Sequence, residues 1–298
     1  MIIQKFKNTA MNLMVKYGKR VPDYIYLKVY SRLRLGKSLN LKQPVTYNDK
    51  INWIKLNDRN PLMTICADKY EVRKLVAEKI GGEYLIPLLW HGEKPEEIPF
   101  ENLPNSYVIK TNNASGTNII VKDKNNINES NIISLLNKWL VRNYYVPKRE
   151  WVYKEIKPLV ICEEMLIQEN DEELKDYRFF CFNGEPKFVS VDFSITEKAN
   201  TRRNLYNLDW ELMEEEITYR KELNLVVEKP EKLEEMISLS KKLAEGFAHV
   251  RIDFYYVNKE IKFGEMTFYH QSGMGEIRPE EFNVKMGQWL SLSKKNII

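Results

Sequence analysis

The stretch at residues 250–268 constrains the fold more than any other part of the sequence. It contains two runs of aromatic and β-branched residues joined by the polar turn Asn258-Lys259-Glu260, which is the pattern of a β-hairpin. Alternation of side chains along the first strand places Arg251, Asp253 and Tyr255 on one face. We therefore expect a hairpin whose first strand has a polar face and an apolar face.

The same alternation places Phe263, Glu265 and Thr267 on one face of the second strand. If the hairpin closes at its short turn, Asp253 and Glu265 point to the same side from neighbouring strands. Two carboxylates held among apolar residues repel each other unless a cation or a proton lies between them. A Mg²⁺ ion that bridges phosphates is one solution, because it binds one or two carboxylates together with substrate oxygens. The alternative is a hairpin with one wet face, and the hairpin alone favours that alternative.

Composition narrows the class of protein. The chain has 298 residues, of which 43% are hydrophobic and 30% charged, so it is able to bury a sizeable core as one large domain or two lobes. No apolar run approaches the length of a membrane span, and we expect no signal peptide. The cysteines, Cys66, Cys162 and Cys181, are few and scattered, which fits a reducing cytoplasm. With only three histidines and no CxxC pair, a structural zinc site is not expected.

The positive charge of the chain is concentrated at its start. Ten Lys and Arg residues lie between residues 5 and 42, against one acid, Asp23, and Pro22 divides the segment into two expected helices. The net charge of +4 is too small to indicate nucleic acid. The segment suits peripheral contact with the inner face of an anionic membrane through residues 1–42, or an anionic glycan. A solvated basic helix packed on the main body is an equal alternative.

Periodicity predicts the remaining elements. Thr46, followed by Asp49, is the expected N-cap of a helix that ends near Asp58. Further helices are expected at 67–80, 130–142 and 230–247, and further strands at 83–90, 106–110, 118–122, 159–168, 177–182 and 186–192.

Residues at two strand ends suit a phosphate. After the strand ending at Lys110, the loop residues Ser115, Gly116 and Thr117 are small and polar, so their backbone N–H groups are able to close over phosphates. This loop does not match the Walker pattern, and by itself an ordinary turn is favoured. Arg178, at the start of a later hairpin, would place a cation on a phosphate or form a plain surface pair.

Two acids, Glu163 and Glu164, end an apolar strand. Acids at strand edges are usually solvated. In a nucleotide site, the backbone of such a strand would meet the adenine edge and a carboxylate would bind the ribose hydroxyls. The strand by itself leaves both interpretations open.

Several segments, taken in order, resemble a known family. They are Pro44–Ile51, Asn57–Leu62, Asp68–Tyr70, Asp176–Gly184 and Phe263–Phe268. Together they resemble the ATP-grasp fold, and more closely the TupA-like ATP-grasp family, which is associated with teichuronopeptide and other bacterial surface-polysaccharide synthesis. The resemblance runs from about Pro44 to Phe282, and the order of the segments is more specific than any one of them.

The resemblance implies an α+β ATP-grasp fold, in which two α+β lobes sandwich the nucleotide and a helical N-terminal segment precedes them. We divide the chain into a basic helical segment at 1–60, an N-lobe with a phosphate flap at 61–165, and a C-lobe with metal-binding strands at 166–298. The resemblance also implies ATP and Mg²⁺ as cofactors. The implied reaction is ligation of a carboxylate to an amine through an acyl phosphate.

The resemblance implies nucleotide contacts position by position. Lys69 and Lys110 would bind the ATP phosphates, under a flap formed by residues 114–117. Glu163 and Glu164 would flank the adenine and the ribose. The flap has fewer glycines than is usual in such enzymes.

The resemblance also implies the reactive centre. Arg178 would face the γ-phosphate or the acyl phosphate, and Asp253 and Glu265 would hold Mg²⁺. Thr267 stands two residues after Glu265, where many ATP-grasp enzymes have an Asn. Its hydroxyl is still able to bind Mg²⁺.

The loop at 269–278 follows the second strand and is the expected acceptor site. Arg278 would clamp a substrate carboxylate, and His270 would take a proton from an amine. A structural loop with a surface Arg is an equal alternative. Arg202 and Arg203 would also meet an anionic sugar.

We expect an ATP-dependent ligase that joins an amino acid or amine to a uronic-acid-type carboxylate, on a glycan or its carrier-linked precursor, in bacterial capsular or cell-wall polysaccharide synthesis. The alternative is a glycosyltransferase of the same pathway, although the sequence has no Asp-x-Asp pair for a sugar nucleotide. A third hypothesis, a non-catalytic glycan- or membrane-binding module, rests on the N-terminal charge alone.

Overall fold

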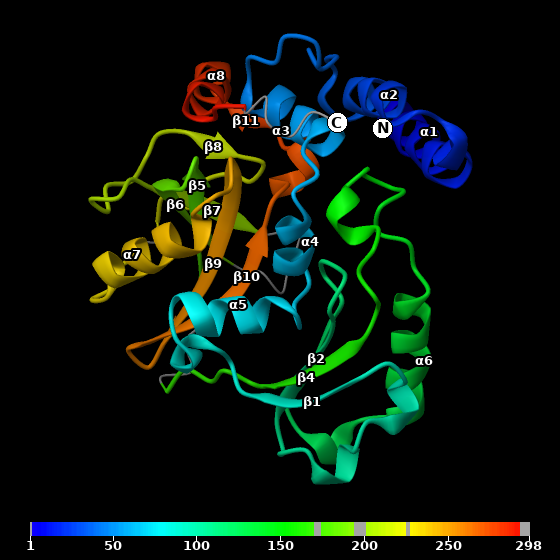
Figure 1. Cartoon of the computed structure of the whole chain (residues 1–298), viewed down its shortest axis with the longest axis vertical. Coiled ribbons are helices and arrows are strands. Elements are labelled where there is room, and N and C mark those ends of the chain that lie inside the picture. Colours follow the sequence, from blue (N-terminus) through cyan, green and yellow to red (C-terminus); the bar gives the residue numbers. More distant parts are fainter. Residues whose placement is uncertain (1, 170–173, 194–200, 225–226, 293–298) are drawn as a thin grey trace.

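The computed structural model describes residues 2–169, 174–193, 201–224 and 227–292. Two antiparallel sheets form the body of this part of the chain, and helices cover them (Figure 1). The smaller sheet has the strand order β1 (Leu88–Gly92), β4 (Val160–Glu164), β2 (Tyr107–Thr111), β3 (Asn118–Val121). The larger sheet has the order β10 (Glu260–Thr267), β9 (His249–Val257), β5 (Asp176–Phe182), β6 (Glu185–Phe193), β7 (Arg202–Tyr206). A separate pair is formed by β8 (Glu216–Ile217) and β11 (Ile277–Arg278).

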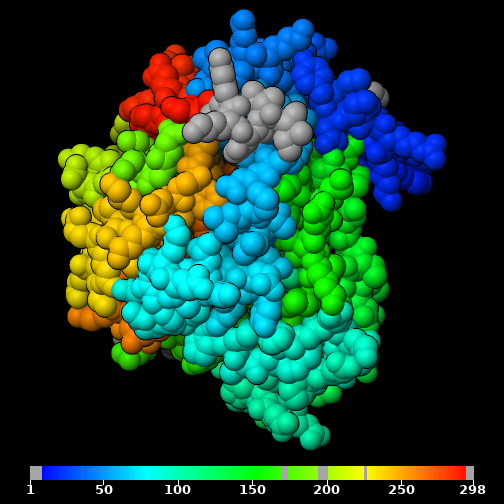
Figure 2. All heavy atoms as spheres, viewed as in Figure 1, coloured from blue at the N-terminus to red at the C-terminus, as the bar shows by residue number. Residues whose placement is uncertain are grey.

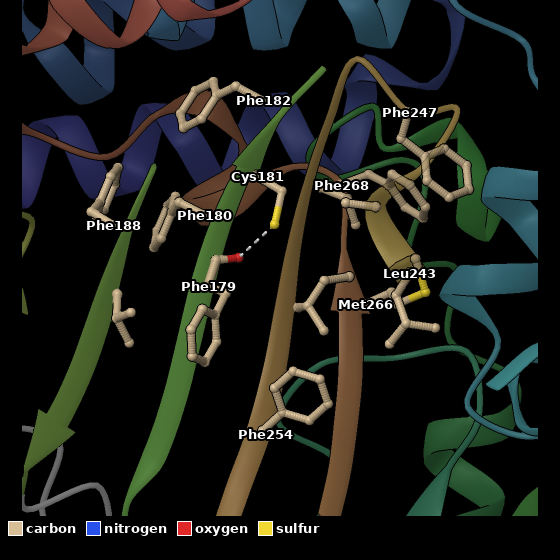
Figure 3. Close-up of a cluster of buried hydrophobic side chains, with 14 of the residues drawn as sticks. Phe179, Phe180, Cys181, Phe182, Phe188, Leu243, Phe247, Phe254, Met266 and Phe268 are labelled. Atoms are coloured by element: carbon tan, nitrogen blue, oxygen red, sulfur yellow. Dashed lines mark hydrogen bonds between the residues drawn. The ribbon is translucent and has the colours of Figure 1, made fainter. Parts of the chain in front are cut away.

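Aromatic side chains fill the core on both faces of the larger sheet (Figure 3). On one face, Phe179 of β5 packs edge-to-face on Phe254 of β9, with ring centroids 5.9 Å apart. On the other face, Phe180 stacks on Phe188 of β6 at 4.4 Å, and Phe188 meets Phe282 of α8 (Glu280–Trp289). α7 (Leu233–Ala244) packs on β5, β6 and β9. Close packing on both faces makes these strands a rigid base for polar side chains.

A β-bulge at Gly264 changes the face of one predicted residue. The hairpin of β9 and β10 closes at its polar turn as expected, and Glu265 pairs with Asp253. Phe263, however, pairs with Phe254, so it lies on the apolar face and not beside Glu265 as strict alternation predicted. The extra residue is Gly264, where an added Cβ would lie 3.1 Å from the carbonyl oxygen of Asp253.

Three helices connect the N-terminal segment to the smaller sheet: α3 (Tyr47–Asn57), α4 (Pro61–Ala67) and α5 (Val72–Lys79). α3 begins with the predicted cap, in which the Thr46 hydroxyl accepts a bond from the Asp49 N–H and the Asp49 carboxylate accepts one from the Thr46 N–H. Met63 and Val76 belong to the core of the larger sheet. Part of the predicted first lobe therefore packs on the second sheet, and the boundaries after residues 60 and 165 stay predictions.

The smaller sheet has its own core. Leu136 of α6 (Glu129–Leu140) packs there with Ile109 and Cys162. The strand predicted at 83–90 begins only at Leu88, because residues 82–84 form a 3-10 turn and Pro87 has no N–H to donate. The strand predicted at 159–168 ends at residue 164.

The N-terminal segment consists of α1 (Ile2–Tyr17), η1 (Gly18–Arg20) and α2 (Asp23–Leu35), and Pro22 separates the helices as predicted. α2 joins the body through Leu27, which packs with Leu39 and Met274. α1 extends from the body beside α2 (Figure 2). Among the described residues, no helix combines the length and apolar character needed to cross a membrane.

Candidate active site

A cavity of about 420 Å³ lies where the two sheets approach each other. Its wall takes Lys110 and Asn118 from the smaller sheet and a row of charged side chains from the larger one. Parts of two further segments, 148–153 and 269–272, also contribute to the wall. The cavity is of the size and position expected for a small-molecule site between two lobes.

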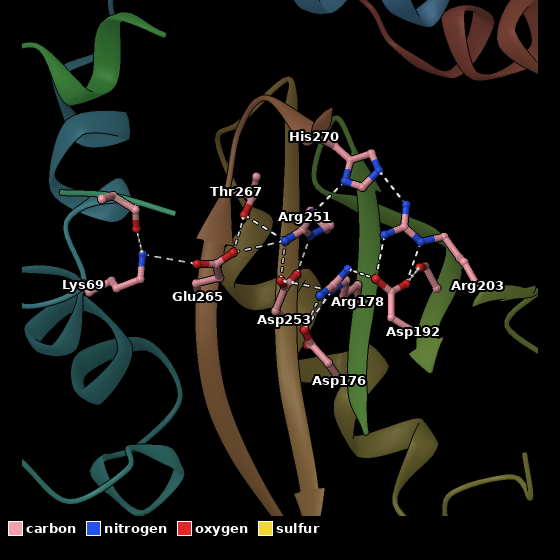
Figure 4. A network of polar contacts seen from close by, with 12 residues as sticks. Lys69, Asp176, Arg178, Asp192, Arg203, Arg251, Asp253, Glu265, Thr267 and His270 are labelled. Atoms are coloured by element: carbon pink, nitrogen blue, oxygen red, sulfur yellow. Dashed lines mark hydrogen bonds and ion pairs between the residues drawn. The ribbon is translucent and has the colours of Figure 1, made fainter. Parts of the chain in front are cut away.

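Arg251 connects the predicted metal-binding residues (Figure 4). Its guanidinium donates to both oxygens of Asp253, at 2.7 and 2.5 Å, and to Glu265 Oε1 at 3.1 Å. It also donates to the Thr267 hydroxyl at 3.1 Å, which itself donates to Glu265 at 3.0 Å. The cation expected between the two carboxylates is therefore present in the protein. Strand alternation places Arg251 on this face, but no role was predicted for it.

Arg178 extends the network along β5. It donates to Asp176 at 2.8 and 2.6 Å and to Asp192 of β6, and lies 3.7 Å from Asp253. Arg203 of β7 holds Asp192 from the other side through two bonds of 2.6 and 2.7 Å. Arg178 lines the cavity, and the three carboxylates around it come from its own strand (Asp176 of β5) and from β6 and β9 on either side.

Lys69 joins the two sides of the cavity. Its ammonium group donates to the Ala114 carbonyl oxygen at 2.7 Å and lies 3.3 Å from Glu265 Oε2. Asp68 holds the turn before α5, because its carboxylate accepts the backbone N–H of Tyr70 at 2.8 Å and the Asn112 side chain at 2.8 Å. This turn positions Lys69 between the flap and the larger sheet.

Lys110 lines the cavity but is paired with a predicted nucleotide-binding acid. It donates to Glu163 Oε2 at 2.8 Å, and Arg73 donates to Glu163 Oε1 at 3.0 Å. Arg73 was not among the predicted site residues. Neither Glu163 nor Glu164 lines the cavity, and their contacts with adenine and ribose stay predictions.

The structure brings part of the flap to the cavity. Ser115 and Gly116 line it, and Gly116 has a φ of 76°, which favours glycine at the tip of the turn. Thr117 is buried instead, and its hydroxyl lies 2.7 Å from that of Thr111. Thr117 therefore fixes the base of the flap, and its predicted contact with ATP is not supported by its position.

His270 and Arg278 do not line the cavity. His270 is buried behind the wall, with its ring nitrogens 2.6 Å from a nitrogen of Arg251 and 3.1 Å from one of Arg203. Burial and these two guanidinium groups hold the pKa of His270 well below its usual range. Arg278 pairs with Glu216 across β8 and β11. Their positions do not support the predicted roles in proton transfer and carboxylate binding.

Comparison with protein families shows to which family the chain belongs. The family model TupA-like ATPgrasp matches residues 49–291. The chain belongs to the TupA-like ATP-grasp family. This membership confirms the resemblance and the predicted ATP-grasp fold, with its helices and antiparallel sheets. The TupA-like region runs from α3 to α8, so α1 and α2 lie before it.

Solved structures that the TupA-like chain is similar to include ligases. D-alanine–D-alanine ligase from Bacillus anthracis, complexed with ATP, is 18% identical with a TM-score of 0.40, over 68% of this chain and 55% of that one. The Helicobacter pylori enzyme is 15% identical with a TM-score of 0.42, over 83% and 70%. Phosphoribosylamine–glycine ligase from Thermotoga maritima is 14% identical with a TM-score of 0.40, over 71% and 49%. The chain thus spans little more than half of the Bacillus anthracis ligase. In the comparison with curated proteins, no protein matches this chain.

The TupA-like cavity contains oxygen ligands that suit Mg²⁺. Asp253 and Glu265 supply carboxylates, and the Thr267 hydroxyl lies beside them. Asp176 Oδ1 is buried and has no hydrogen-bond partner among the described residues, although Asp176 lines the cavity. Within the described ranges, no group of three or more His, Cys, Asp or Glu is arranged to hold a metal ion. Two carboxylates and a hydroxyl suit Mg²⁺ that arrives as part of a nucleotide complex, in which phosphate oxygens would supply the other ligands.

The two carboxylates that would hold Mg²⁺ differ in pKa. Burial raises the pKa of Asp253 to about 7, even though Arg251 acts against this shift. Burial would also raise the pKa of Glu265, but the charges of Lys69 and Arg251 outweigh it and lower the pKa to about 2. Glu265 is thus charged across the physiological range, and a bound cation would favour the charged form of Asp253 as well.

Stability should depend on the ionisation of Asp192. Burial opposes its charge, but Arg203 and Arg178 outweigh this and lower its pKa to about 2. A carboxyl whose pKa is depressed in the folded state stabilises the fold above its unfolded pKa of about 4, by about 2 kcal/mol here, and loses that contribution as pH falls towards 2. Urea unfolding from pH 5 to pH 2.5 should show the wild type losing its advantage over Asp192→Asn. A difference that stays constant over this range would contradict the assignment.

Proposed function

We propose that this TupA-like protein is an ATP-dependent ligase that joins a carboxylate to an amine through an acyl phosphate. The observation that supports the proposal most is the convergence of Lys69, Lys110 and Arg178 in one cavity with the carboxylates of Asp253 and Glu265. Cations from both sides of a cavity suit the phosphates of a nucleotide, and paired carboxylates suit its metal ion.

The reaction requires positioning and charge more than a protein nucleophile. A substrate carboxylate attacks the γ-phosphate and ADP leaves, and the amine then displaces phosphate from the acyl phosphate. Lys69 and Lys110 neutralise phosphate oxygens on one side of the cavity. Arg178 and Arg251 line the cavity from the larger sheet, where they stabilise charge on the transferred group. Mg²⁺, when bound at Asp253 and Glu265, would add positive charge at the phosphates.

The flap is positioned to protect the acyl phosphate from water. An acyl phosphate reacts with water, so the site must exclude water while the amine approaches. The Ala114 carbonyl group is held by Lys69, and Lys69 contacts Glu265 on the opposite side. The same lysine therefore links the closure of the flap to the phosphate site.

We extend the proposal to the substrates. The carboxylate would belong to a uronic acid in a glycan or its carrier-linked precursor, the acceptor would be an amino acid or amine, and the reaction would serve bacterial capsular or cell-wall polysaccharide synthesis in the cytoplasm. Family membership supports this pathway. Lys148 lines the cavity and offers a cation for an anionic sugar, whereas Arg203, which was also predicted to meet the sugar, is paired with Asp192.

Thermal unfolding tests the nucleotide site. ATP with Mg²⁺ at about a hundred times its dissociation constant should raise the midpoint by about 4 °C, since such a ligand adds about 2.7 kcal/mol. Lys69→Met should lose most of this shift, whereas Lys74→Met, on the exposed side of α5, should keep it.

ADP release that needs both a carboxylate and an amine would establish the reaction. Stabilisation by a UDP-sugar but not by ATP would instead support a glycosyltransferase.

A further inference from the structure

Large hydrophobic side chains are exposed in a cluster on the N-terminal helices. Of the fourteen that are exposed in the described part of the chain, six lie between residues 13 and 29. They are Leu13, Tyr17, Val21, Tyr24, Ile25 and Val29, and they are 37% to 66% exposed. Single exposed apolar residues are ordinary, but a cluster marks a surface that meets another apolar phase or a partner. We call these residues and the basic side chains among them the N-terminal patch.

The N-terminal patch carries positive charge without a free acid to balance it. Lys16, Lys19 and Arg20 are exposed among its apolar side chains, and Arg32 follows on the next turns of α2. The one acid of the segment, Asp23, is committed inward: it pairs with Arg149 at 2.9 Å and accepts the Tyr145 hydroxyl at 2.5 Å. The outward surface is therefore both apolar and cationic.

The body of the protein fixes the patch in place. Tyr26 is fully buried, and its hydroxyl donates to the Pro147 carbonyl oxygen at 3.0 Å. The guanidinium of Arg149 lies 3.9 Å from the centre of the Tyr26 ring and donates to the Gly18 carbonyl oxygen at 2.5 Å. These contacts hold the inner side of α2 and η1 against the body, while the apolar residues of the patch stay exposed.

The same anchor places the patch near the cavity. Arg149 stands between Lys148 and Glu150, and both of these neighbours line the cavity wall. The patch also lies in α1 and α2, before the region that the family model matches. The patch is thus an addition beside the active cavity rather than part of the nucleotide site.

We propose that the N-terminal patch docks the protein on the surface of an anionic lipid membrane. Basic side chains are attracted to acidic headgroups, and the apolar side chains among them enter the headgroup boundary. A soluble anionic glycan would satisfy the charges, but its polar surface offers little to cover the aliphatic side chains of Leu13, Ile25 and Val29. The combination of both surfaces therefore favours a membrane.

Vesicle sedimentation of the full chain tests the proposal. The protein should bind vesicles of phosphatidylcholine with phosphatidylglycerol and should not bind phosphatidylcholine alone. The triple variant Lys16→Gln, Lys19→Gln, Arg20→Gln should bind about a hundredfold more weakly, since each basic side chain near an anionic surface strengthens binding about fivefold. Lys122→Gln, Lys138→Gln, Lys187→Gln removes the same charge from exposed positions elsewhere and should bind as the wild type does.

A second pair of variants separates burial of apolar surface from charge. Leu13→Asn with Ile25→Asn should weaken vesicle binding roughly tenfold, and Val141→Asn with Ile167→Asn, at exposed sites outside the patch, should not. Unchanged thermal unfolding shows that each variant is folded. Equal binding by the triple variant and the wild type would overturn the proposal. Binding to a soluble polyanion such as heparin without binding to acidic vesicles would also overturn it and assign the charges to a glycan.

Discussion

Glu265→Gln should reduce ATP turnover by about a thousandfold and leave the protein folded. The substitution keeps the shape of the side chain but removes the charge that faces Lys69 and Arg251. It also removes one of the two carboxylates that would hold Mg²⁺. Because the side chain of Glu265 is 30% exposed, its neutral form does not leave a fully buried unpaired group. Steady-state ADP release with saturating substrates measures the effect.

A matched control lies on the same strand. Glu260→Gln makes the same chemical change at the outer end of β10, where Glu260 pairs with Lys262 and is 65% exposed. It should turn over ATP as the wild type does. Full activity in Glu265→Gln would show that Asp253 and Glu265 are a structural pair, and would remove the proposed metal site from the reaction.

Arg203→Met should lower the free energy of unfolding by about 3–5 kcal/mol, which is the effect of leaving a buried charge without its partner. Arg203 is almost completely buried and holds both oxygens of Asp192. Arg202→Met, a half-buried neighbour on β7, should cost much less. Urea denaturation at pH 7 measures both.

A double variant distinguishes an unpaired charge from lost packing. Arg203→Met combined with Asp192→Asn removes both charges, so it should be more stable than the sum of the single effects predicts. Strictly additive effects would mean that Arg203 stabilises the core through its volume alone.

The sequence predicted the parts of the site that depend on local pattern. The pairing of Asp253 with Glu265 follows from strand alternation and a short turn, which leave the hairpin little freedom of register. The cap at Thr46 is likewise a local signal. The bulge that turned Phe263 to the apolar face breaks alternation by one residue, and Gly264 was its only local sign.

The remaining features depend on contacts between distant segments. The pairing of Arg178 with Asp192, and of Asp192 with Arg203, requires β5, β6 and β7 to be neighbours. His270 was predicted to meet substrate because it follows a site strand. The backbone at His270 instead turns back, and the buried side chain lies behind Arg251. Such positions follow from sheet order and the path of a loop, which side-chain periodicity does not encode.

The balance of charge in the cavity has a consequence for ionic strength. Six basic and five acidic side chains line its wall, and most of them already contact one another, so the formal charges of the cavity nearly balance. Dissolved salt screens exposed, unbalanced charge far more than it screens buried pairs. The N-terminal patch carries the unbalanced kind, and the cavity the balanced kind. The salt concentration of the cell would therefore govern where the protein resides much more than how tightly it holds its nucleotide.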